Sequence, residues 1–250
     1  MRPDPTDRRS FLAITGAAAG GFILTPATLA QPKPESPSPK DDEKKQPEGE
    51  EDVSPAEDLM REHGVLRRAL LVYSEAGSRI ASSGNDIPLA VLGDTATLFR
   101  SFGEEYHERA LEEKHVFPTL IAKGGAIADT AKTLTQQHQR GREITDYISA
   151  IARKGRIGTA ESAPLANTLA GFVRMYEHHA AIEDTIIFPA WKAAISDAQY
   201  EDLSEQFEDL EHRMFGKDGF EDALARIAKI EQAFGLSDLA ALTAAPPPIR

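Results

Sequence analysis

The sequence contains no cysteine, and this absence limits the chemistry open to the protein. It excludes disulfides, thiolate metal sites, iron–sulfur clusters and a cysteine nucleophile. Any bound metal must therefore be held by histidine and carboxylate side chains, and such ligands suit iron, manganese or zinc. The 7 histidines and 40 acidic residues of the chain supply both ligand types.

Positive charge is also scarce. The 250 residues carry 28 Lys and Arg against 40 Asp and Glu, which gives a formal net charge of −12. This balance argues against nucleic acid and against an anionic membrane surface as partners. Hydrophobic residues make up 41% of the chain, which is enough for one domain with a real core plus extensions.

Residues 1–30 have the features of a twin-arginine signal peptide. Arg8-Arg9 is followed by an apolar run rich in Ala and Gly, and small residues end at Ala30. The run is too short for a good spanning helix, and there is no cysteine for a lipid anchor. We expect cleavage after Ala30, export to the periplasm or the medium, and no stable membrane insertion after processing. Because this route carries folded proteins, often with a cofactor bound, it also hints at a metal.

Helical periodicity dominates the rest of the chain. Residues 31–53 are rich in Pro and charge with almost nothing to bury, so we expect a disordered linker there. Beyond it, apolar residues recur at helical spacing and no run alternates with period 2, while a capping box at Ser54-Pro55-Ala56-Glu57 marks the first helix start. The expected helices cover residues 55–82, 88–122, 127–154, 162–195, 197–214 and 219–234.

The first four of these helices predict an all-α, up-down-up-down four-helix bundle over residues 54–195. The last two form a C-terminal helical extension over residues 196–236, and residues 237–250 form a tail. An internal repeat supports this plan, because the chain then consists of two helical hairpins of similar design. The repeat pairs Leu111-Glu112-Glu113 and Phe117-Pro118 with Ile182-Glu183-Asp184 and Phe188-Pro189.

Helix heights bring several polar side chains to one layer of the predicted bundle. An α-helix rises about 1.5 Å per residue, so residues equally far from a connecting turn lie level. By that count His63 lies level with His107, and Glu112 lies level with His138. His138 in turn lies level with His179, and Glu183 faces the same way as His179. Because burying so many ionisable groups without a metal would be costly, we predict a binuclear metal centre with the ligands His63, His107, Glu112, His138, His179 and Glu183.

These motifs resemble those of the hemerythrin-like family of histidine–histidine–glutamate cation-binding domains. The resemblance covers about residues 55–195 and rests on Glu62-His63, His107, Glu112-Glu113, Phe117-Pro118, His138, His179, Glu183-Asp184 and Phe188-Pro189. It implies a four-helix bundle that holds two non-haem irons, bridged by the two carboxylates and an oxo or hydroxo group. It also implies one open metal position where oxygen binds. Manganese or zinc is the alternative to iron.

One departure from the family pattern lies on the third helix. The oxygen-carrying members have a second histidine one turn after the ligand of this helix, and Arg142 stands there in this sequence. With four histidines in the layer, more metal positions are open to water, peroxide or nitric oxide. This weakens the case for simple reversible oxygen carriage.

A second departure is the spacing of the first motif. Glu112 follows His107 by five residues, whereas Glu183 follows His179 by four. We expect a local π-bulge that lets both His107 and Glu112 face inward, because such bulges gather at functional sites. The alternative is that Glu108, four residues before Glu112, takes the ligand place.

Other polar residues lie close to the predicted layer. Further candidate metal ligands are Glu108, His115 and His178, although a rim or surface position is the better interpretation of both histidines. Candidates for contacts around the ligands are Glu113, Asp184, Tyr73, Tyr106, Tyr176 and Arg142. His212 is expected to serve packing of the extension. No group outside the layer has the pattern of a nucleophile or an acid–base pair, so the sequence names no catalytic residue.

Three functions fit this sequence. The first is a non-haem di-iron protein that binds, senses or buffers oxygen, nitric oxide or iron. The second is a di-iron enzyme with peroxidase, catalase-like or oxidase activity, and peroxide is then a small ligand of its metal site. The third is a metal-free helical module that acts through its C-terminal helices. The metal-layer motifs favour the first two functions, and we prefer binding to catalysis; the sequence identifies no protein partner.

Overall fold

The structure is a computed structural model that describes residues 53–83 and 87–248. The predicted signal peptide (residues 1–30) and all of the predicted linker except Val53 lie outside the described residues. Within the described residues the chain contains helices and no strand, which confirms the predicted all-α class. The helices found are α1 (Pro55–Ser83), α2 (Leu89–Leu98), η1 (Phe99–Val116), α3 (Phe117–Lys123), α4 (Gly125–Arg153), α5 (Thr159–Ile182), η2 (Glu183–Ile187), α6 (Phe188–Lys192), α7 (Asp197–Phe215) and α8 (Gly219–Phe234).

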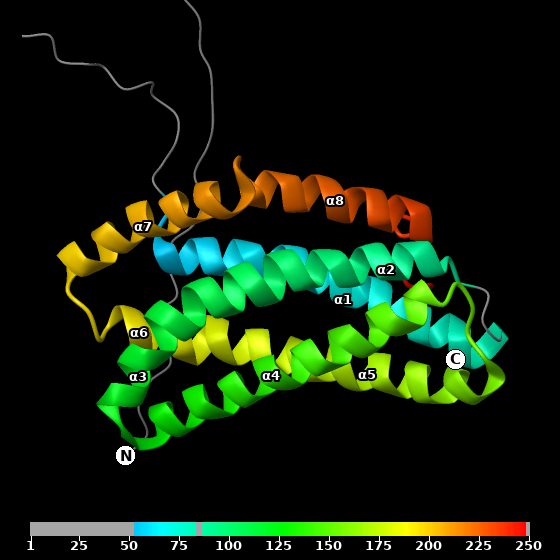
Figure 1. Cartoon of the computed structure of the whole chain (residues 1–250), viewed down its shortest axis with the longest axis horizontal. Coiled ribbons are helices and arrows are strands. Elements are labelled where there is room, and N and C mark those ends of the chain that lie inside the picture. Colours follow the sequence, from blue (N-terminus) through cyan, green and yellow to red (C-terminus); the bar gives the residue numbers. More distant parts are fainter. Residues whose placement is uncertain (1–52, 84–86, 249–250) are drawn as a thin grey trace, which may run out of the picture. The chain divides into compact units, whose positions relative to one another are not determined.

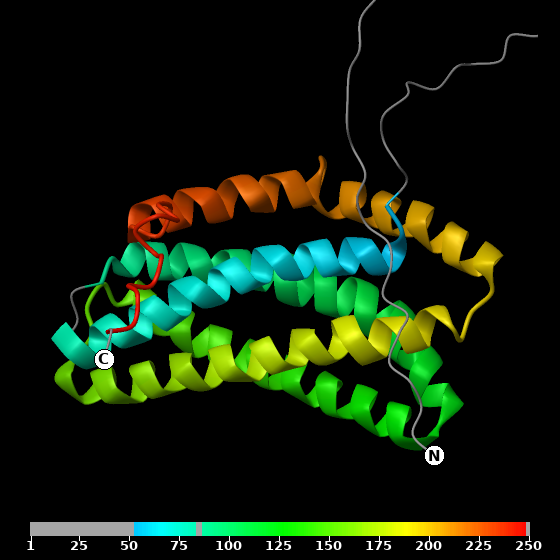
Figure 2. The ribbon, with the colours of Figure 1, turned by 180° about the vertical axis from the view of Figure 1, so that it is seen from behind.

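The helices pack side by side as two layers and a cover. Figures 1 and 2 show α1 beside α5, and α2 with α3 beside α4, and these pairs are in contact. The helices α2, η1 and α3 follow one another without a turn, as do α5, η2 and α6. The extension runs along one side of the bundle, with α7 against α1 and η1, and α8 against α1 and α2.

Capping side chains and glycines set the helix ends in the extension. At the start of α7, Gln199 N–H donates to Ser196 Oγ, and Ser196 N–H donates to Gln199 Oε1 at 3.0 Å. This is the reciprocal capping box that satisfies two free backbone donors. The helix ends at Gly216, which takes the left-handed conformation with φ 68° that glycine adopts without strain. Helix α8 starts at Asp218, whose side chain accepts from Glu221 N–H at 2.8 Å.

An aromatic cluster fills the bundle beside the layer of histidines. The rings of Tyr73, Phe99, Phe172 and Tyr176 contact one another at centroid distances of 4.7–6.2 Å, mostly edge to face. All four side chains are buried, and burial of such rings dominates the stability of a core. A layer of buried aromatic rings therefore borders the predicted histidine layer, where Tyr176 contacts His179.

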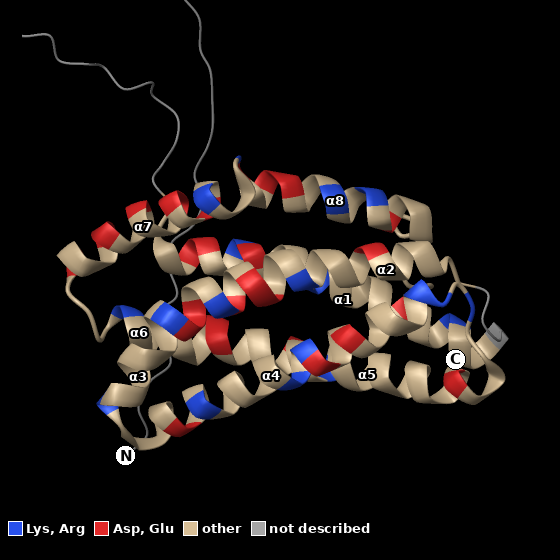
Figure 3. Ribbon diagram, in the orientation of Figure 1, with Lys and Arg blue, Asp and Glu red and all other residues tan. Residues whose placement is uncertain are grey.

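The outer face of the molecule is charged. Acidic residues recur along α7, and Phe207 is the only buried side chain of this helix (Figure 3). None of the described helices is long and apolar enough to span a bilayer.

Candidate metal centre

Both repeated motifs contain a π-helix. The segment η1 runs through His107 and Glu112, and η2 starts at Glu183. At the end of each segment, the Phe before a proline donates its N–H to the carbonyl oxygen of the glutamate five residues earlier, Glu112 in η1 and Glu183 in η2. Proline lacks an N–H and its ring collides with the carbonyl four residues before it, so a wider turn there relieves the collision. The predicted bulge near residues 107–112 is confirmed, and it is longer than expected, since η1 has 18 residues.

The π-helix explains how side chains five residues apart share a face. Where backbone bonds run from i to i+5, the wider turn brings residues i and i+5 to the same face of the helix. His107 and Glu112 are accordingly both buried, with exposed fractions of 2% and 0%. In η1, Glu108 is also buried, but it turns to other partners that are described below.

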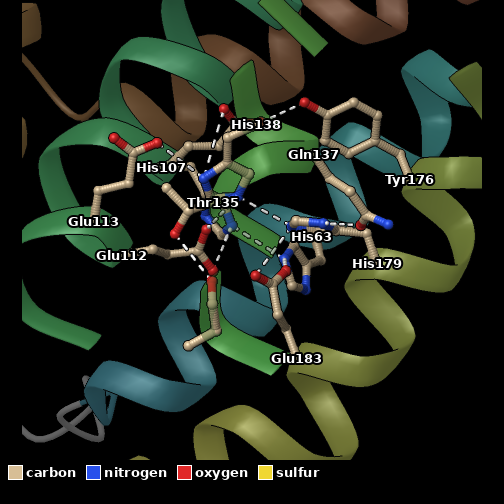
Figure 4. A network of polar contacts seen from close by, with 12 residues as sticks. His63, His107, Glu112, Glu113, Thr135, Gln137, His138, Tyr176, His179 and Glu183 are labelled. Carbon is tan, nitrogen blue, oxygen red and sulfur yellow. Dashed lines mark hydrogen bonds and ion pairs between the residues drawn. The ribbon is translucent and has the colours of Figure 1, made fainter. Parts of the chain in front are cut away.

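The structure brings six predicted side chains together inside the bundle (Figure 4). They come from α1, η1, α4, α5 and η2, and each is at most 2% exposed. We call them the histidine–glutamate cluster. Its members are His63, His107, Glu112, His138, His179 and Glu183.

Each histidine of the cluster has an acceptor at its outer ring nitrogen. His63 Nδ1 lies 2.6 Å from Asp184 Oδ1, and His107 Nδ1 lies 2.5 Å from Glu62 Oε2. The other two histidines follow the same rule: His138 Nδ1 lies 3.0 Å from Glu113 Oε1, and His179 Nδ1 lies 2.9 Å from Gln137 Oε1. These acceptors assign the ring proton to Nδ1 in every case.

The inner nitrogens of the four rings then carry lone pairs. The Nε2 atoms of His63 and His107 are 3.0 Å apart, and those of His138 and His179 are also 3.0 Å apart. Two lone pairs at this distance repel each other unless a proton or a metal ion joins them. The arrangement therefore favours a cation beside each pair of rings.

The two glutamates reach both pairs of rings. One oxygen of Glu112 lies 3.4 Å from His107 Nε2, and its other oxygen lies 3.4 Å from His138 Nε2. Glu183 does the same, with one oxygen 3.4 Å from His63 Nε2 and the other 3.0 Å from His179 Nε2. The cluster thus contains two groups of four donor atoms that share both carboxylates.

The donor atoms fit metal ions. All four oxygens of Glu112 and Glu183 are buried, and within the described residues none has a hydrogen-bond donor. Uncompensated buried carboxylates are costly, so a cation is expected beside them. Two imidazole nitrogens and two carboxylate oxygens per group are a ligand set for iron, manganese or zinc.

The cluster's own charges also shift its pKa values. Burial by itself raises the pKa of Glu183, but the adjacent His179 and His63 lower it well below its usual range. Burial lowers the pKa of His138, yet Glu108, Glu112 and Glu113 together raise it to about 10. In the metal-free chain, protons on the rings therefore compensate the carboxylates, and metal binding must displace them.

Glu108 lies outside both groups of four. Its Oε1 accepts from the Tyr176 hydroxyl at 2.7 Å, and its Oε2 lies 3.2 Å from Arg142 Nη2. Arg142 also pairs with Glu113, which holds the outer nitrogen of His138. Glu108, Glu113 and His138 form a third group of potential ligand atoms, but the guanidinium already supplies the positive charge there.

The structure keeps the other predicted histidines away from the cluster. His115 is half-buried, its ring stands edge-on to Phe207, and its carbonyl accepts from Trp191 Nε1 at 3.1 Å. His178 is exposed because it lies about 100° around the helix from His179. His212 is exposed as well, so the expected packing role of this side chain is wrong.

The remaining predicted neighbours divide into two sets. The first set contacts the cluster or its partners in the ways given above and consists of Asp184, Glu113, Arg142 and Tyr176. Asp184 also binds Arg67, whose Nη2 lies 2.5 Å from its carboxylate. The hydroxyls of Tyr73 and Tyr106 are buried and have no hydrogen-bond partner within the described residues. The spacing of the tyrosines along the helices places all three near the histidine layer, but it does not show which hydroxyl finds a hydrogen-bond partner.

Sequence reasoning missed two partners of the ligand rings, Glu62 and Gln137. Each directly precedes a cluster histidine in the chain, but each contacts a histidine of another helix, His107 and His179 respectively. Neighbouring residues on a helix point about 100° apart, so Glu62 and Gln137 point away from the histidines that follow them in the chain. Which histidine of another helix each one contacts depends on how the helices pack. The only sequence signal was the presence of a polar residue before each histidine.

Two phenylalanines close the cluster on its outer side. Phe117 stacks on His138 at 5.3 Å between ring centroids, and Phe188 stacks on His63 at 5.6 Å. Both follow from the repeated Phe-Pro motif, in which the proline ends the π-helix. The rings exclude water from the cluster and restrict the imidazoles.

A small cavity opens beside the cluster between α1, η1 and α5. It measures about 10 Å³, which is room for one water-sized molecule. Four members of the cluster line it, together with Leu66, Arg67, Leu70, Glu108, Tyr176 and Ala180. A water-sized molecule can therefore lie beside the residues of the cluster.

The fold and the cluster define a helical protein with a buried histidine–carboxylate cation site. The chain matches the hemerythrin HHE cation binding domain over residues 54–191, and it therefore belongs to this family.

Three relatives of nearly the same length are similar to this chain in sequence. The chain is 39% identical over 242 residues to Uncharacterized protein Mb2018 of Mycobacterium bovis, and equally to Uncharacterized proteins MT2051 and Rv1995 of Mycobacterium tuberculosis. Each match covers 96% of this chain and 92% of the relative. No solved structure matches the chain.

Proposed function

We propose that the protein binds a non-haem di-iron centre in an up-down-up-down four-helix bundle and uses it to bind, sense or buffer oxygen, nitric oxide or iron. The observation that carries this proposal is the pair of donor groups that share both carboxylates. Each group offers two imidazole nitrogens and one oxygen from each of Glu112 and Glu183. Iron bound there would supply the open coordination positions at which a small ligand attaches.

The protein's own residues prepare the site in three ways. The acceptors at Nδ1 turn the four imidazoles so that Nε2 faces inward. The Phe-Pro segments hold the π-turns that aim the two glutamates. The apolar part of the cavity limits the ligand to a few atoms.

Metal analysis and an optical spectrum test this proposal. The full chain, purified in air or reconstituted with ferrous iron, should hold two irons and show the near-ultraviolet bands of an oxo-bridged pair. Absence of both iron and these bands would favour the metal-free interaction module. Zinc or manganese at two per chain would keep the binuclear site and reject iron.

A di-iron enzyme is the second candidate function, and one observation favours it. The hydrogen-bonded pair Tyr176 and Glu108 is among the residues that line the cavity beside the cluster. Steady turnover of hydrogen peroxide that disappears in Glu183→Ala but persists in Glu177→Ala would establish catalysis. Glu177 is an exposed residue of α5, which continues directly into η2 at Glu183, so it is a matched control.

We further propose export through the twin-arginine route, which rests on Arg8-Arg9 and the apolar run after it. Replacing both arginines with lysine should retain the chain inside the cell. Cell fractionation of the wild type and the double variant decides this point, and equal export of both would contradict it.

A further inference from the structure

Two histidines of the cluster belong to a larger arrangement that we call a clamp. In each clamp the outer ring nitrogen contacts a carboxylate, and an arginine four residues after the histidine binds the same carboxylate. The first clamp is His63, Asp184 and Arg67, and the second clamp is His138, Glu113 and Arg142.

The internal repeat builds both clamps in the same way. The clamp carboxylate directly follows a glutamate of the cluster, since Asp184 follows Glu183 and Glu113 follows Glu112. It reaches a histidine on another helix, from η2 to α1 in the first clamp and from η1 to α4 in the second. Residues four apart on α1 or α4 share a face, so the arginine stands on the same side as the histidine. Each group of four donor atoms contains one clamped histidine, so the clamps affect both candidate metal positions.

In both clamps the guanidinium and the imidazole share one carboxylate. His63 Nδ1 lies 2.6 Å from Asp184 Oδ1, while Arg67 Nη2 lies 2.5 Å from Oδ2. In the second clamp both groups contact the same oxygen, Glu113 Oε1, and His138 Nδ1 lies farther from it, at 3.0 Å (Figure 4). A carboxylate that accepts from the ring N–H makes the imidazole a more basic metal ligand. A guanidinium at the same carboxylate attracts part of its negative charge and so weakens this effect.

The two arginines differ in burial. The side chain of Arg142 is 13% exposed and that of Arg67 is 43% exposed. Arg142 also lies 3.2 Å from Glu108 Oε2, so it is held from two sides. Because water screens an exposed charge more strongly than a buried one, Arg142 should have the larger influence on the cluster.

We propose that Arg67 and Arg142 are positioning residues that raise the reduction potential of iron in the cluster by drawing the charge of Asp184 and Glu113 away from the ligand imidazoles. A less basic imidazole and a fixed positive charge nearby both favour the metal ion of lower charge. The clamps therefore favour ferrous over ferric iron. This inference rests on the proposed function, since it assumes that iron binds to the cluster.

A redox titration of the iron-loaded full chain tests the proposal, with the absorption of the iron centre as the signal. Arg142→Ala should increase the preference for ferric over ferrous iron about tenfold, which lowers the potential by about 59 mV per electron. Arg67→Ala should increase this preference about threefold, because the side chain is more exposed. Arg142→Lys keeps the positive charge, so it should recover at least about half of the change.

Arg68→Ala and Arg140→Ala are the matched controls. Arg68 follows Arg67 on α1 but binds Glu231 of α8, and Arg140 precedes the clamp arginine of α4 by two residues but pairs with the exposed Glu143. Each control removes one positive charge from the same helix, and its ferric preference should stay within about twofold of the wild type. Iron content and melting temperature are measured for every variant.

The outcomes separate this inference from the proposed function. If the wild type and all variants hold two irons and Arg67→Ala and Arg142→Ala match the controls, or show a higher potential, the role of the arginines is overturned and the proposed function stands. A wild type that binds no iron overturns both. Arg67→Gln, at an exposed position, should fold and load iron even if Arg142→Ala does not, and it should give the same change of about threefold as Arg67→Ala.

Discussion

The two glutamate-bearing walls of the centre share a plan but not their surroundings. The first wall (α2, η1 and α3) supplies His107 and Glu112, and the second wall (α5, η2 and α6) supplies His179 and Glu183. In both, a π-turn at the glutamate is followed by Phe-Pro, and the phenylalanine N–H closes the wider turn on the glutamate carbonyl. The shared motif therefore sets the direction of the glutamate carboxylate in each wall.

The difference between the walls lies around the ligand histidines. His107 has the buried carboxylate of Glu62 at its outer nitrogen, whereas His179 has the neutral amide of Gln137. A carboxylate partner makes an imidazole a more basic metal ligand than an amide partner does. Two sets of donor atoms that look alike are thus expected to bind metal with different strength.

The largest effect should come from the two glutamates that belong to both groups of donor atoms. Glu112→Ala or Glu183→Ala removes an oxygen from each donor group, so both irons should bind at least about 100-fold more weakly. Elemental analysis after gel filtration measures the loss, and far-ultraviolet circular dichroism checks that the helices remain. If either variant retains one tightly bound iron, the carboxylates do not act as equal bridges.

Exchanging the outer partners should reverse the difference between the walls. Glu62→Gln should weaken the position that contains His107 by about 10–100-fold, and Gln137→Glu should strengthen the position that contains His179. Stepwise titration with ferrous iron, followed by calorimetry, resolves the two binding events. Equal stepwise constants in the wild type and in both variants would show that the outer partners have no such influence.

Without metal, the two walls should differ in stability when a ring is removed. Each variant removes the ring beside one cluster glutamate, but at the outer nitrogen His107→Ala leaves the buried carboxylate of Glu62 without this partner, whereas His179→Ala leaves a half-buried amide. We expect the first variant to be less stable than the second by about 2 kcal/mol. Urea unfolding of the metal-free proteins measures the difference, with His178→Ala as the exposed control beside His179.

The smallest effect concerns a carboxylate that the first wall alone carries. Glu104 is fully buried, and its pKa is raised to about 7 by burial and by the charge of Glu108. Thr145 and Arg100 lower this pKa, but they cancel only part of the rise. The residue 71 positions later in the repeat is the apolar Met175.

A folded-state pKa above the unfolded value of 4.5 means that stability is present below that value and is lost as the pH rises through 7. Between pH 5 and 6 the wild type should lose about 1 kcal/mol relative to Glu104→Gln. Urea unfolding of both proteins at the two pH values measures this loss. Parallel pH dependence of the two proteins would contradict it.

Much of the fold follows from sequence patterns of short range. The predicted helix limits of 55–82 and 219–234 agree with α1 and α8 to within one residue, because capping residues and glycines act locally. The predicted helix over 162–195 starts three residues late and continues three residues too far. Its start has Gly158 rather than a side-chain cap, and its end follows Phe188-Pro189, where the chain turns after Lys192.

The repeat also shows where the sequence is ambiguous. At the offset that aligns Glu112 with Glu183, the residue that matches His179 is Glu108, and His107 matches the exposed His178. An ordinary α-helix would therefore turn Glu108 toward the cluster and His107 away from it. The π-helix reverses this choice, and it depends on the packing of η1 against α4 and α7 as well as on Pro118.

The sequence alone determined the helical class, the polar layer and the six side chains that the structure brings together, because periodicity and helix rise are properties of the backbone. Tertiary structure alone decided which residue holds each outer nitrogen, where Glu108 points and that a cavity reaches Tyr176. These features depend on contacts between helices, such as those of Glu62 with His107 and of Gly141 with Tyr176. Such contacts form only after the helices have packed, because the residues of each pair lie on different helices.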